Sequence, residues 1–578
     1  MLYFLLVWGL LLGASFVTGM GCLYLFKIDS FSRSGHRFLV SSWLGLVILA
    51  NIFFAIALLI PLSPVIGILI LGVCVGFVVR ISSIRNEITN ILLKISDRWL
   101  LIGAAVALLA ASLVSKQVTW FDTGLYHFGS IRWIANYGAV PGVALLNNGF
   151  AFVSSWFALA APFNPDFLGS RSTAVLNGYL LFLFLLQGSV SGHYILTRVA
   201  KKSDWFVVIY LFLTLPLFVF TPFLSAVLIS PSPDLPVILM TGVVAWTILQ
   251  TSEKPLGHSN KTIGEVLEKS RLTPTHAIVP LILAVGAVTF KLNGLPILGV
   301  CALYYGFKNW HQPVSLAIGT GITLLLLSPM VFFGIVTSGC PLYPSSWMCV
   351  SAPWALSTQQ ADNALARING WQNWFVPPPT DTNVWLWKLN QWLQLSHLNK
   401  VMLLLAIVAV PIIIWILWKT NIRKNAADLW LIALSLLGMV FIFSQAPLIR
   451  FGLGYFVLLP TLVLSTLCTQ IFSSSRCICR VLQPIDKLPK AATFSVLFMA
   501  SLTFLGFSGV NFSHQFFIPP ELPQVTVNLV KVNDVDYFLP ENTNKCWGSA
   551  IPCVPKQLGN DIWLRNPERG IAAGFIRK

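Results

Sequence analysis

Charged side chains are scarce in this sequence. Only 10% of the 578 residues are Asp, Glu, Lys or Arg, whereas 56% are hydrophobic. A soluble domain carries roughly 25% charged residues, so this chain cannot cover a water-facing surface over most of its length. The mean hydropathy of +0.78 supports the same conclusion. The scarcity of charge therefore excludes an ordinary soluble protein and indicates a membrane protein.

Several common catalytic motifs are also absent. The sequence contains no GxxxxGK[ST] nucleotide loop, no GxGxxG after a strand and no HExxH zinc motif. It shows no convincing Ser–His–Asp order. The net charge is +17, but no basic run is interleaved with aromatic residues in a soluble stretch, so we expect no nucleic-acid partner. Among enzymes, this leaves those that use a carboxylate at a membrane surface.

Apolar runs, in contrast, recur from one end of the chain to the other. A helix that crosses the ~30 Å hydrocarbon layer needs about 20 such residues. We therefore predict an all-α polytopic membrane protein with about 14 transmembrane helices. The runs cover residues 2–26, 39–61, 64–79, 99–115, 174–197, 205–227, 236–250, 277–290, 295–307, 314–335, 399–418, 428–445, 451–471 and 493–510.

Basic residues alternate between the loops that join these runs. Lys27, Arg33 and Arg37 follow the first run, whereas the short loops PLSP and SPSPDLP contain no Lys or Arg. Lys and Arg accumulate in cytoplasmic loops, so the alternation predicts a multi-pass membrane protein with both termini extracytoplasmic. This topology requires 150–163 to be an interfacial or re-entrant segment. It also requires 277–307 to form two short helices broken at KLNGLP.

The loops and runs divide the chain into five parts. A core contains the external loop 116–173 and should carry the chemistry. The stretch VTVNLVKV near the end alternates apolar and polar residues before an Asn-Asp turn, which predicts a small β-rich extracytoplasmic tail. The parts are N-terminal helices (1–98), the core (99–335), a long external loop (336–398), C-terminal helices (399–511) and the tail (512–578).

Two pairs of cysteines lie in predicted external segments. Cys340 and Cys349 share the long loop, and Cys546 and Cys553 share the tail. Local pairs in an oxidising compartment predict disulfides. Each small ring would contribute about 2.5 kcal/mol on the chain-entropy estimate.

The stretch FDTGLYHFGSIRWIANYG places an acid, an imidazole and a guanidinium in one segment after a membrane span. Asp122 follows two aromatic residues, and a carboxylate at such a wall can act as a general base. Alternatively, Asp122 caps a helix that begins near Gly124. His127 either assists Asp122 or caps the loop. Arg132 lies on a short amphipathic helix, where it binds either a headgroup or a substrate phosphate.

Three further charged residues stand at the predicted external ends of helices. Lys291 either holds a phosphate or snorkels to the interface. Arg450 either clamps a phosphate or anchors the topology. Asp234, in SPSPDLP, either orients a substrate or caps its helix.

These features resemble the GT-C superfamily of membrane glycosyltransferases, which includes protein O-mannosyltransferases and the aminoarabinose transferases of lipid A. The shared features are an acid soon after a transmembrane helix, a juxtamembrane helix behind it, the segment SPSPDLPVILM, and RFGLGYFVLLP from Arg450 to Pro460. DTG replaces the usual acidic pair, so the second acid is missing. The whole pattern is most similar to an uncharacterised family of bacterial multi-pass proteins, which implies that the protein lies in a bacterial inner membrane.

The resemblance implies transfer of a sugar from a polyprenyl-phosphate donor to an acceptor on the extracytoplasmic face. Asp122 would be the base, His127 and Asp234 would orient the substrates, and Arg132, Lys291 and Arg450 would bind the phosphate. The resemblance implies no particular cofactor, and it is compatible with a divalent metal ion at the site. The expected partners are the donor, membrane lipids and an acceptor glycan, lipid or protein.

Three alternatives remain. A polysaccharide polymerase or ligase would use the same class of donor. A lipid-linked glycan transporter would place charges near the bilayer midplane and would show related halves, whereas the acids here lie at helix ends and no repeat is visible. A non-catalytic scaffold would bind through its tail.

Overall fold

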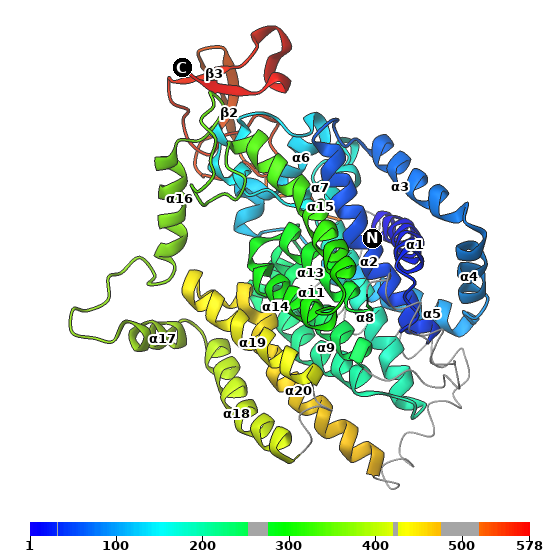
Figure 1. Cartoon of the computed structure of the whole chain (residues 1–578). Coiled ribbons are helices and arrows are strands. Elements are labelled where there is room, and N and C mark those ends of the chain that lie inside the picture. The colour runs from blue at the N-terminus through cyan, green and yellow to red at the C-terminus, as the bar shows by residue number, and fades with distance from the viewer. Residues whose placement is uncertain (32, 253–274, 420–425, 475–518) are drawn as a thin grey trace.

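Long helices form the body of the protein, and a small strand-containing tail covers one end (Figure 1). The computed structural model describes all residues except 32, 253–274, 420–425 and 475–518. Within the described residues, ten helices are long and apolar enough to cross a membrane. They are α1 (Leu2–Leu25), α2 (Ser34–Ala57), α5 (Asp97–Val114), α8 (Val175–Leu196), α9 (Lys202–Phe220), α11 (Asp234–Ser252), α15 (Pro313–Ser338), α18 (His397–Lys419), α19 (Ala426–Gln445) and α20 (Ile449–Ser474).

A bent pair of helices raises the number of candidate spans in the described part to eleven if the pair is counted as one span. Helices α3 (Pro64–Val79) and α4 (Ser82–Leu92) form this pair, which is bent by 101° at the break between them. The predicted break at KLNGLP is confirmed, because the short turn η6 (Leu292–Gly294) separates α13 (Ile278–Phe290) from α14 (Leu295–Lys308). The protein is thus an all-α multi-pass membrane protein. The count of 14 stays a prediction, since run 493–510 lies outside the described residues.

The centre of the bundle is formed by the most deeply buried helices. In both α8 and α11, 89% of the spanning window is buried inside the protein. Helices α1 and α2 cross at two glycines, where a Cβ at Gly19 or Gly45 would overlap a backbone carbonyl of the other helix. Small residues allow this close approach, which is a common way for helices to pack in membranes. Helix α13 packs on α2 in a similar way at Gly286, where a Cβ would lie 2.5 Å from the Val47 side chain.

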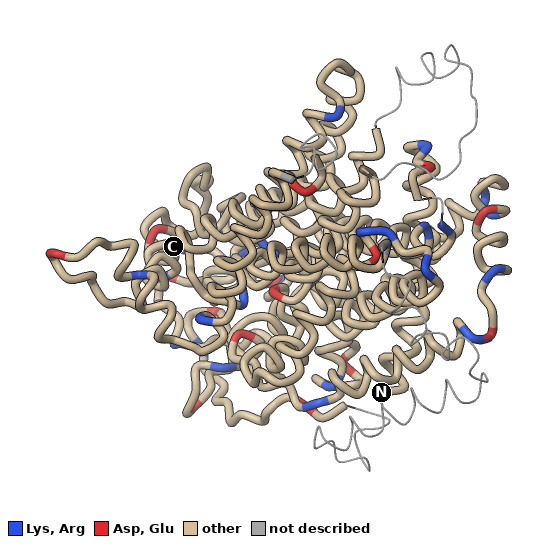
Figure 2. The backbone as a smooth tube through the Cα atoms, turned by 90° about the horizontal axis from the view of Figure 1, so that it is seen from below, with Lys and Arg blue, Asp and Glu red and all other residues tan. Residues whose placement is uncertain are grey.

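The bundle has two chemically different ends. We name the end with residues 115–174 the loop end. The first helix starts there, since Tyr3 Oη donates to the Phe163 carbonyl at 2.7 Å, and the tail reaches it through Phe575 N–H to Pro141 O at 2.9 Å. The opposite end holds ion pairs between helices, such as Lys202 with Asp428 at 2.7 Å. Most of the backbone tube carries neither acidic nor basic residues (Figure 2).

The segment between α5 and α8 folds as short helical pieces. Its longest helix is α6, as expected for IRWIANYG. The segment 150–163 does not cross the bundle, because its longest helix has six residues. The pieces are η1, a π-helical turn (Thr123–His127), α6 (Phe128–Tyr137), η2 (Val143–Leu145), η3 (Asn148–Ala151), α7 (Ser155–Ala160), η4 (Ala161–Phe163) and η5 (Asp166–Leu168).

The remaining elements cover or flank the loop end. Strands β1 (Val527–Val532) and β2 (Val535–Pro540) form an antiparallel hairpin around Asn533, and β3 (Ile562–Leu564) pairs with β4 (Phe575–Arg577). The predicted β-rich tail is therefore confirmed. Both predicted disulfides, Cys340–Cys349 and Cys546–Cys553, are also present. The other pieces are α10 (Pro222–Leu228), α16 (Thr358–Gly370), α17 (Val384–Leu395) and η10 (Pro567–Ala573).

Candidate functional site

Four charged side chains from four distant segments meet at the loop end. The Arg450 Nη1 atom lies 3.0 Å from Asp122 Oδ2 and 3.7 Å from Asp234 Oδ2. The Lys291 ammonium contacts Asp234 Oδ1. Two acids and two cations therefore form one continuous cluster, which we call the charged cluster. The sequence had singled out all four residues, but not their contacts.

The ends of four elements position these side chains. Asp234 is the first residue of α11, Lys291 follows the last residue of α13, and Arg450 is the second residue of α20. Asp122 precedes η1, but its side chain makes no capping hydrogen bond. Its carboxylate instead contacts Arg450, which argues against the helix-capping alternative. Asp122 Oδ1 has no hydrogen-bond partner among the described residues, so one carboxylate oxygen remains available.

Aromatic rings enclose the two cations. The Arg450 guanidinium carbon lies 4.8 Å from the centre of the Trp120 ring and 4.6 Å from that of Phe451. The Lys291 Nζ atom lies 4.3 Å from the Phe451 ring. Such cation–π contacts each contribute roughly 0.5–2 kcal/mol. They fix the direction of both cations without using their hydrogen-bond donors.

Buried polar atoms near the charged cluster lack partners. Asp234 Oδ2, Arg450 Nε, His127 Nδ1 and Asn293 Oδ1 make no hydrogen bond among the described residues. Asp234 is only 1% exposed. Native proteins leave few such atoms unsatisfied, and each needs an explanation. Their concentration around one charged cluster is typical of a site whose polar partners come from a ligand or from solvent.

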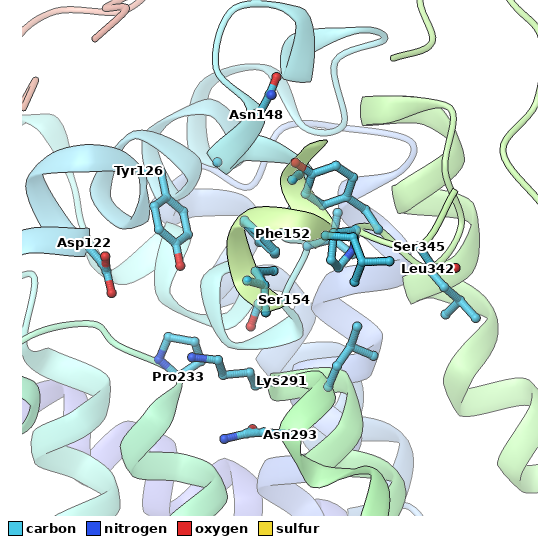
Figure 3. Close-up of a pocket in the computed structure, with 18 of the residues that line it drawn as sticks. Asp122, Tyr126, Asn148, Phe152, Ser154, Pro233, Lys291, Asn293, Leu342 and Ser345 are labelled. Carbon is cyan, nitrogen blue, oxygen red and sulfur yellow. The ribbon is translucent and has the colours of Figure 1, made fainter. Parts of the chain in front are cut away.

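Two neighbouring residues of η1, Tyr126 and His127, have side chains whose pKa is shifted from its usual value. Burial, followed by the positive charge of Lys291, holds the pKa of His127 well below its usual value, so the imidazole is neutral at pH 7. Burial and the two nearby carboxylates raise the pKa of Tyr126 well above its usual value, so its hydroxyl stays protonated. The sequence reasoning missed Tyr126, although it lies next to His127 and four residues after Asp122. Asp122 and Tyr126 extend from one wall while Lys291 approaches from another (Figure 3).

A cavity of about 1590 Å³ connects this site to the side of the bundle. It is larger than the roughly 300–1,000 Å³ of an ordinary small-molecule pocket. Asp122, Tyr126, Lys291 and Arg450 line its charged part. Its apolar wall comes from α14, α15 and α19 and includes Leu295, Leu298, Leu324, Leu327, Val331, Phe441 and Ile442.

The apolar wall runs deep along α15. Leu324 lines the cavity, yet its side chain is 63% exposed, and Phe332 is 57% exposed. From Ser338 at the loop end to Leu324 the helix descends about 21 Å at 1.5 Å per residue. The cavity therefore runs from the charged cluster along the side of a membrane-spanning helix.

Arg132 lies apart from the charged cluster. Its guanidinium donates to the Ser549 carbonyl at 2.7 Å and lies 3.7 Å from Asp166 Oδ1. The structure thus brings Asp122, Asp234, Lys291 and Arg450 together, places His127 beside them, and directs Arg132 to the tail. Its role in phosphate binding stays a prediction that this geometry does not support.

The tail closes over the loop that carries Asp122. The Gly124 carbonyl accepts hydrogen bonds from the N–H groups of Cys546 at 2.8 Å and Trp547 at 3.2 Å. The Lys545 Nζ atom lies 4.5 Å from the centre of the Phe121 ring. A Cβ at Gly124 would lie 2.7–2.9 Å from three carbons of the Trp547 ring, so only glycine fits here without a shift. We call residues 545–553 the tail clamp.

The charged cluster does not resemble a metal centre. Among the residues that the structure describes, no group of three or more His, Cys, Asp or Glu side chains is arranged to hold an ion. Each carboxylate of the charged cluster already contacts a cation. The donor set therefore fits an anionic or hydroxylated ligand better than a divalent metal.

Fold and site together define a multi-pass membrane protein with a charged site at one end of an apolar cavity. Residues 1–457 match the family described as a domain of unknown function (DUF8201), and the chain belongs to that family. The match includes all four residues of the charged cluster and ends before the tail. No curated protein and no solved structure matches the chain. The family description assigns no activity, so the function has to be argued from the geometry.

Proposed function

We propose that the protein is a GT-C type membrane glycosyltransferase, which moves a sugar from a polyprenyl-phosphate donor to an acceptor on the extracytoplasmic face of a bacterial inner membrane. One observation carries the proposal: the charged cluster lies at the loop end of a cavity whose apolar wall follows α15 from Phe332 to Leu324, about 12 Å of helix. A lipid-linked sugar phosphate matches both parts of this cavity, because it has a charged, polar head and a long apolar chain. The exposed side chains on α15, such as Leu324, would let that chain enter from the bilayer.

The orientation of the loop end rests on two further features. Both disulfides of the described chain lie there, and disulfides persist in oxidising compartments. Ion-paired basic residues such as Arg33 and Lys202 gather at the opposite end, as cytoplasmic loops of membrane proteins do. Both features support an extracytoplasmic loop end.

In the proposed reaction, Asp122 accepts the proton of the acceptor hydroxyl through its Oδ1 atom. The hydroxyl oxygen forms a bond to the anomeric carbon of the sugar. The bond between that carbon and the phosphate oxygen breaks, and its electron pair stays on the phosphate. Polyprenyl phosphate and the glycosylated acceptor are the products.

The cations act where charge grows during this step. Lys291 and Arg450 stabilise the leaving phosphate, which gains negative charge in the transition state. Asp234 holds both cations in place, since it contacts each of them. The protonated Tyr126 lines the cavity and supplies a hydroxyl that orients the sugar, while the buried, neutral His127 packs against the Tyr126 ring at 4.5 Å between ring centres.

Transport of a lipid-linked glycan is the second candidate, because the cavity volume of about 1590 Å³ would also accommodate a large headgroup in transit. A polymerase or ligase would perform the same bond chemistry on a longer glycan. Covalent transfer of a labelled sugar separates the two enzymatic candidates from transport.

The decisive variant is Asp122→Asn, which keeps the shape of the side chain and removes the base. Membranes that contain the protein would be incubated with a panel of radiolabelled polyprenyl-phosphate sugars, and label in a new acceptor fraction would be counted. General base catalysis contributes about 10²–10⁴-fold, so transfer should fall by that factor. Asp166→Asn is the matched control, since Asp166 is an exposed acid in the same loop and lies outside the cavity lining.

Full activity of Asp122→Asn would refute the assignment of the base. A cryo-EM map of the protein in nanodiscs with added polyprenyl phosphate gives an independent check. We expect the phosphate beside Lys291 and Arg450 and the chain along α15.

A further inference from the structure

The mouth of the cavity at the loop end is polar and comes from three separate parts of the chain. Asn148 belongs to the loop between α5 and α8, whereas Asn363 and Arg367 belong to α16. Asn544, Lys556 and Gln557 belong to the tail. Amide side chains both donate and accept hydrogen bonds, which suits the hydroxyl groups of a sugar. None of these six residues belongs to the charged cluster, and none has a role in the reaction steps described above.

Positive charge is in excess at this mouth. Five charged side chains line the cavity: Asp122, Lys291, Arg367, Arg450 and Lys556. Lys291 and Arg450 are paired with carboxylates of the charged cluster. Arg367 and Lys556 have no carboxylate within 4.0 Å among the described residues, and both are exposed. The mouth therefore offers two cations that no acid of the described chain neutralises.

A buried hydroxyl at the same place also lacks a partner. Tyr343 lines the cavity, is 4% exposed, and its Oη atom makes no hydrogen bond among the described residues. Tyr343 packs in one apolar cluster with Ala361 and Ala364 of α16, the helix that carries Arg367, and Arg367 lines the same cavity. An unpartnered buried hydroxyl beside an unpaired cation is typical of a site built to receive a polar, negatively charged group.

We propose that this mouth binds the acceptor, and that the acceptor is a hydroxylated molecule with a negative charge, an acidic glycan. Arg367 and Lys556 would bind its carboxylate or phosphate groups, while the amides and Tyr343 would bind its hydroxyls. Three of the named residues come from the strand-containing tail at the loop end, so the mouth faces water and suits a glycan better than a lipid headgroup. The identification of the bound glycan as the acceptor rests on the proposed transferase function, whereas the binding of an acidic glycan does not.

The test uses the full-length protein in nanodiscs and needs no donor. The probes are fluorescently labelled tri-galacturonate and labelled maltotriose, which have the same length and differ in charge. We expect the wild-type protein to bind the acidic probe more tightly than the neutral one. Losing each charge-assisted contact should weaken acidic binding about tenfold, so Arg367→Gln/Lys556→Gln should abolish the preference. The control variant Lys531→Gln should keep the preference for the acidic probe, because Lys531 lies outside the cavity lining and pairs with Asp536.

Equal binding of the two probes, or an unchanged preference in the double variant, would overturn the proposal. A second arm varies the phosphatidylglycerol content of the nanodiscs: displacement of the acidic probe by this lipid would show that the mouth takes a headgroup, which also overturns it. These outcomes are independent of the transferase test, because Asp122→Asn leaves the mouth intact and binding is measured without transfer.

Discussion

Arg450 links both carboxylates of the charged cluster. It contacts Asp122 and Asp234, and its guanidinium lies against Trp120 and Phe451. Asp234 is 1% exposed, so removal of its neighbouring cation leaves a buried charge with weaker compensation. Breaking a buried pair is costly, whereas replacing both members is often tolerated.

Arg450→Ala should therefore destabilise the protein by on the order of 2 kcal/mol, less than the 3–5 kcal/mol of a fully buried pair, because Lys291 still contacts Asp234. Thermal unfolding in detergent, followed by tryptophan fluorescence, measures the change. The double variant Arg450→Ala/Asp234→Asn should recover part of the loss. Lys531→Ala breaks an exposed pair in the tail and should change stability by less than about 1 kcal/mol. A double variant no more stable than Arg450→Ala would contradict this account.

Charge at helix ends was enough to find the four residues of the charged cluster from the sequence. Their contacts were not predictable, because the partners are 57 residues apart for Lys291 with Asp234 and 328 apart for Arg450 with Asp122. Tyr126 and Tyr343 were missed for a different reason. A tyrosine in an apolar chain is an ordinary interfacial residue, and only the surrounding charges distinguish these two.

At the scale of elements, the tail clamp connects a strand-containing unit to the loop that carries Asp122. Trp547 packs against Gly124, and two backbone N–H groups of the clamp donate to the same carbonyl. The Cys546–Cys553 disulfide closes this segment of the tail. The clamp therefore holds the backbone two residues from the candidate base.

Gly124→Ala should loosen the clamp, because the new methyl group would lie 2.7–2.9 Å from the Trp547 ring. Hydrogen exchange of residues 119–127 and 545–553 should increase, while the exchange of α8 and α11 stays unchanged. Gly548→Ala is the matched control, since its Cβ would make only ordinary contacts of 3.5 Å with Ser170. Equal exchange in the two variants would mean that the Trp547 contact does not hold the loop.

Helical elements were predictable where the apolar pattern was long, and also at the KLNGLP break, where a polar stretch interrupts it. The bend between α3 and α4 was missed, since the apolar run ends at Val79 and α4 is amphipathic, with Ile84, Ile88 and Ile91 buried. The π-helical turn η1 was also missed. The tail clamp contacts this turn at Gly124, and no local pattern in DTGLYH encodes such a tertiary contact.

At the scale of the whole molecule, the two ends of the bundle should face different compartments. A cysteine introduced at Gln524, which is exposed in the tail, should react with a membrane-impermeant maleimide on spheroplasts. A cysteine at Lys94, which is exposed between α4 and α5, should react only after the membrane is permeabilised. The parent chain without added cysteines gives the background. The reverse pattern would invert the topology and place the charged cluster in the cytoplasm.

The separation of the paired residues along the chain also imposes an order on biogenesis. During synthesis, Asp234 can meet Lys291 after 57 further residues, whereas Asp122 must wait 328 residues for Arg450. Until α20 has been synthesised, the Asp122 carboxylate therefore lacks the cation that it contacts in the folded protein. Arg450 then completes the charged cluster, because it contacts both Asp122 and Asp234. A nascent chain that ends before α20 would thus contain Asp122, Asp234 and Lys291 without the arginine that links the two acids.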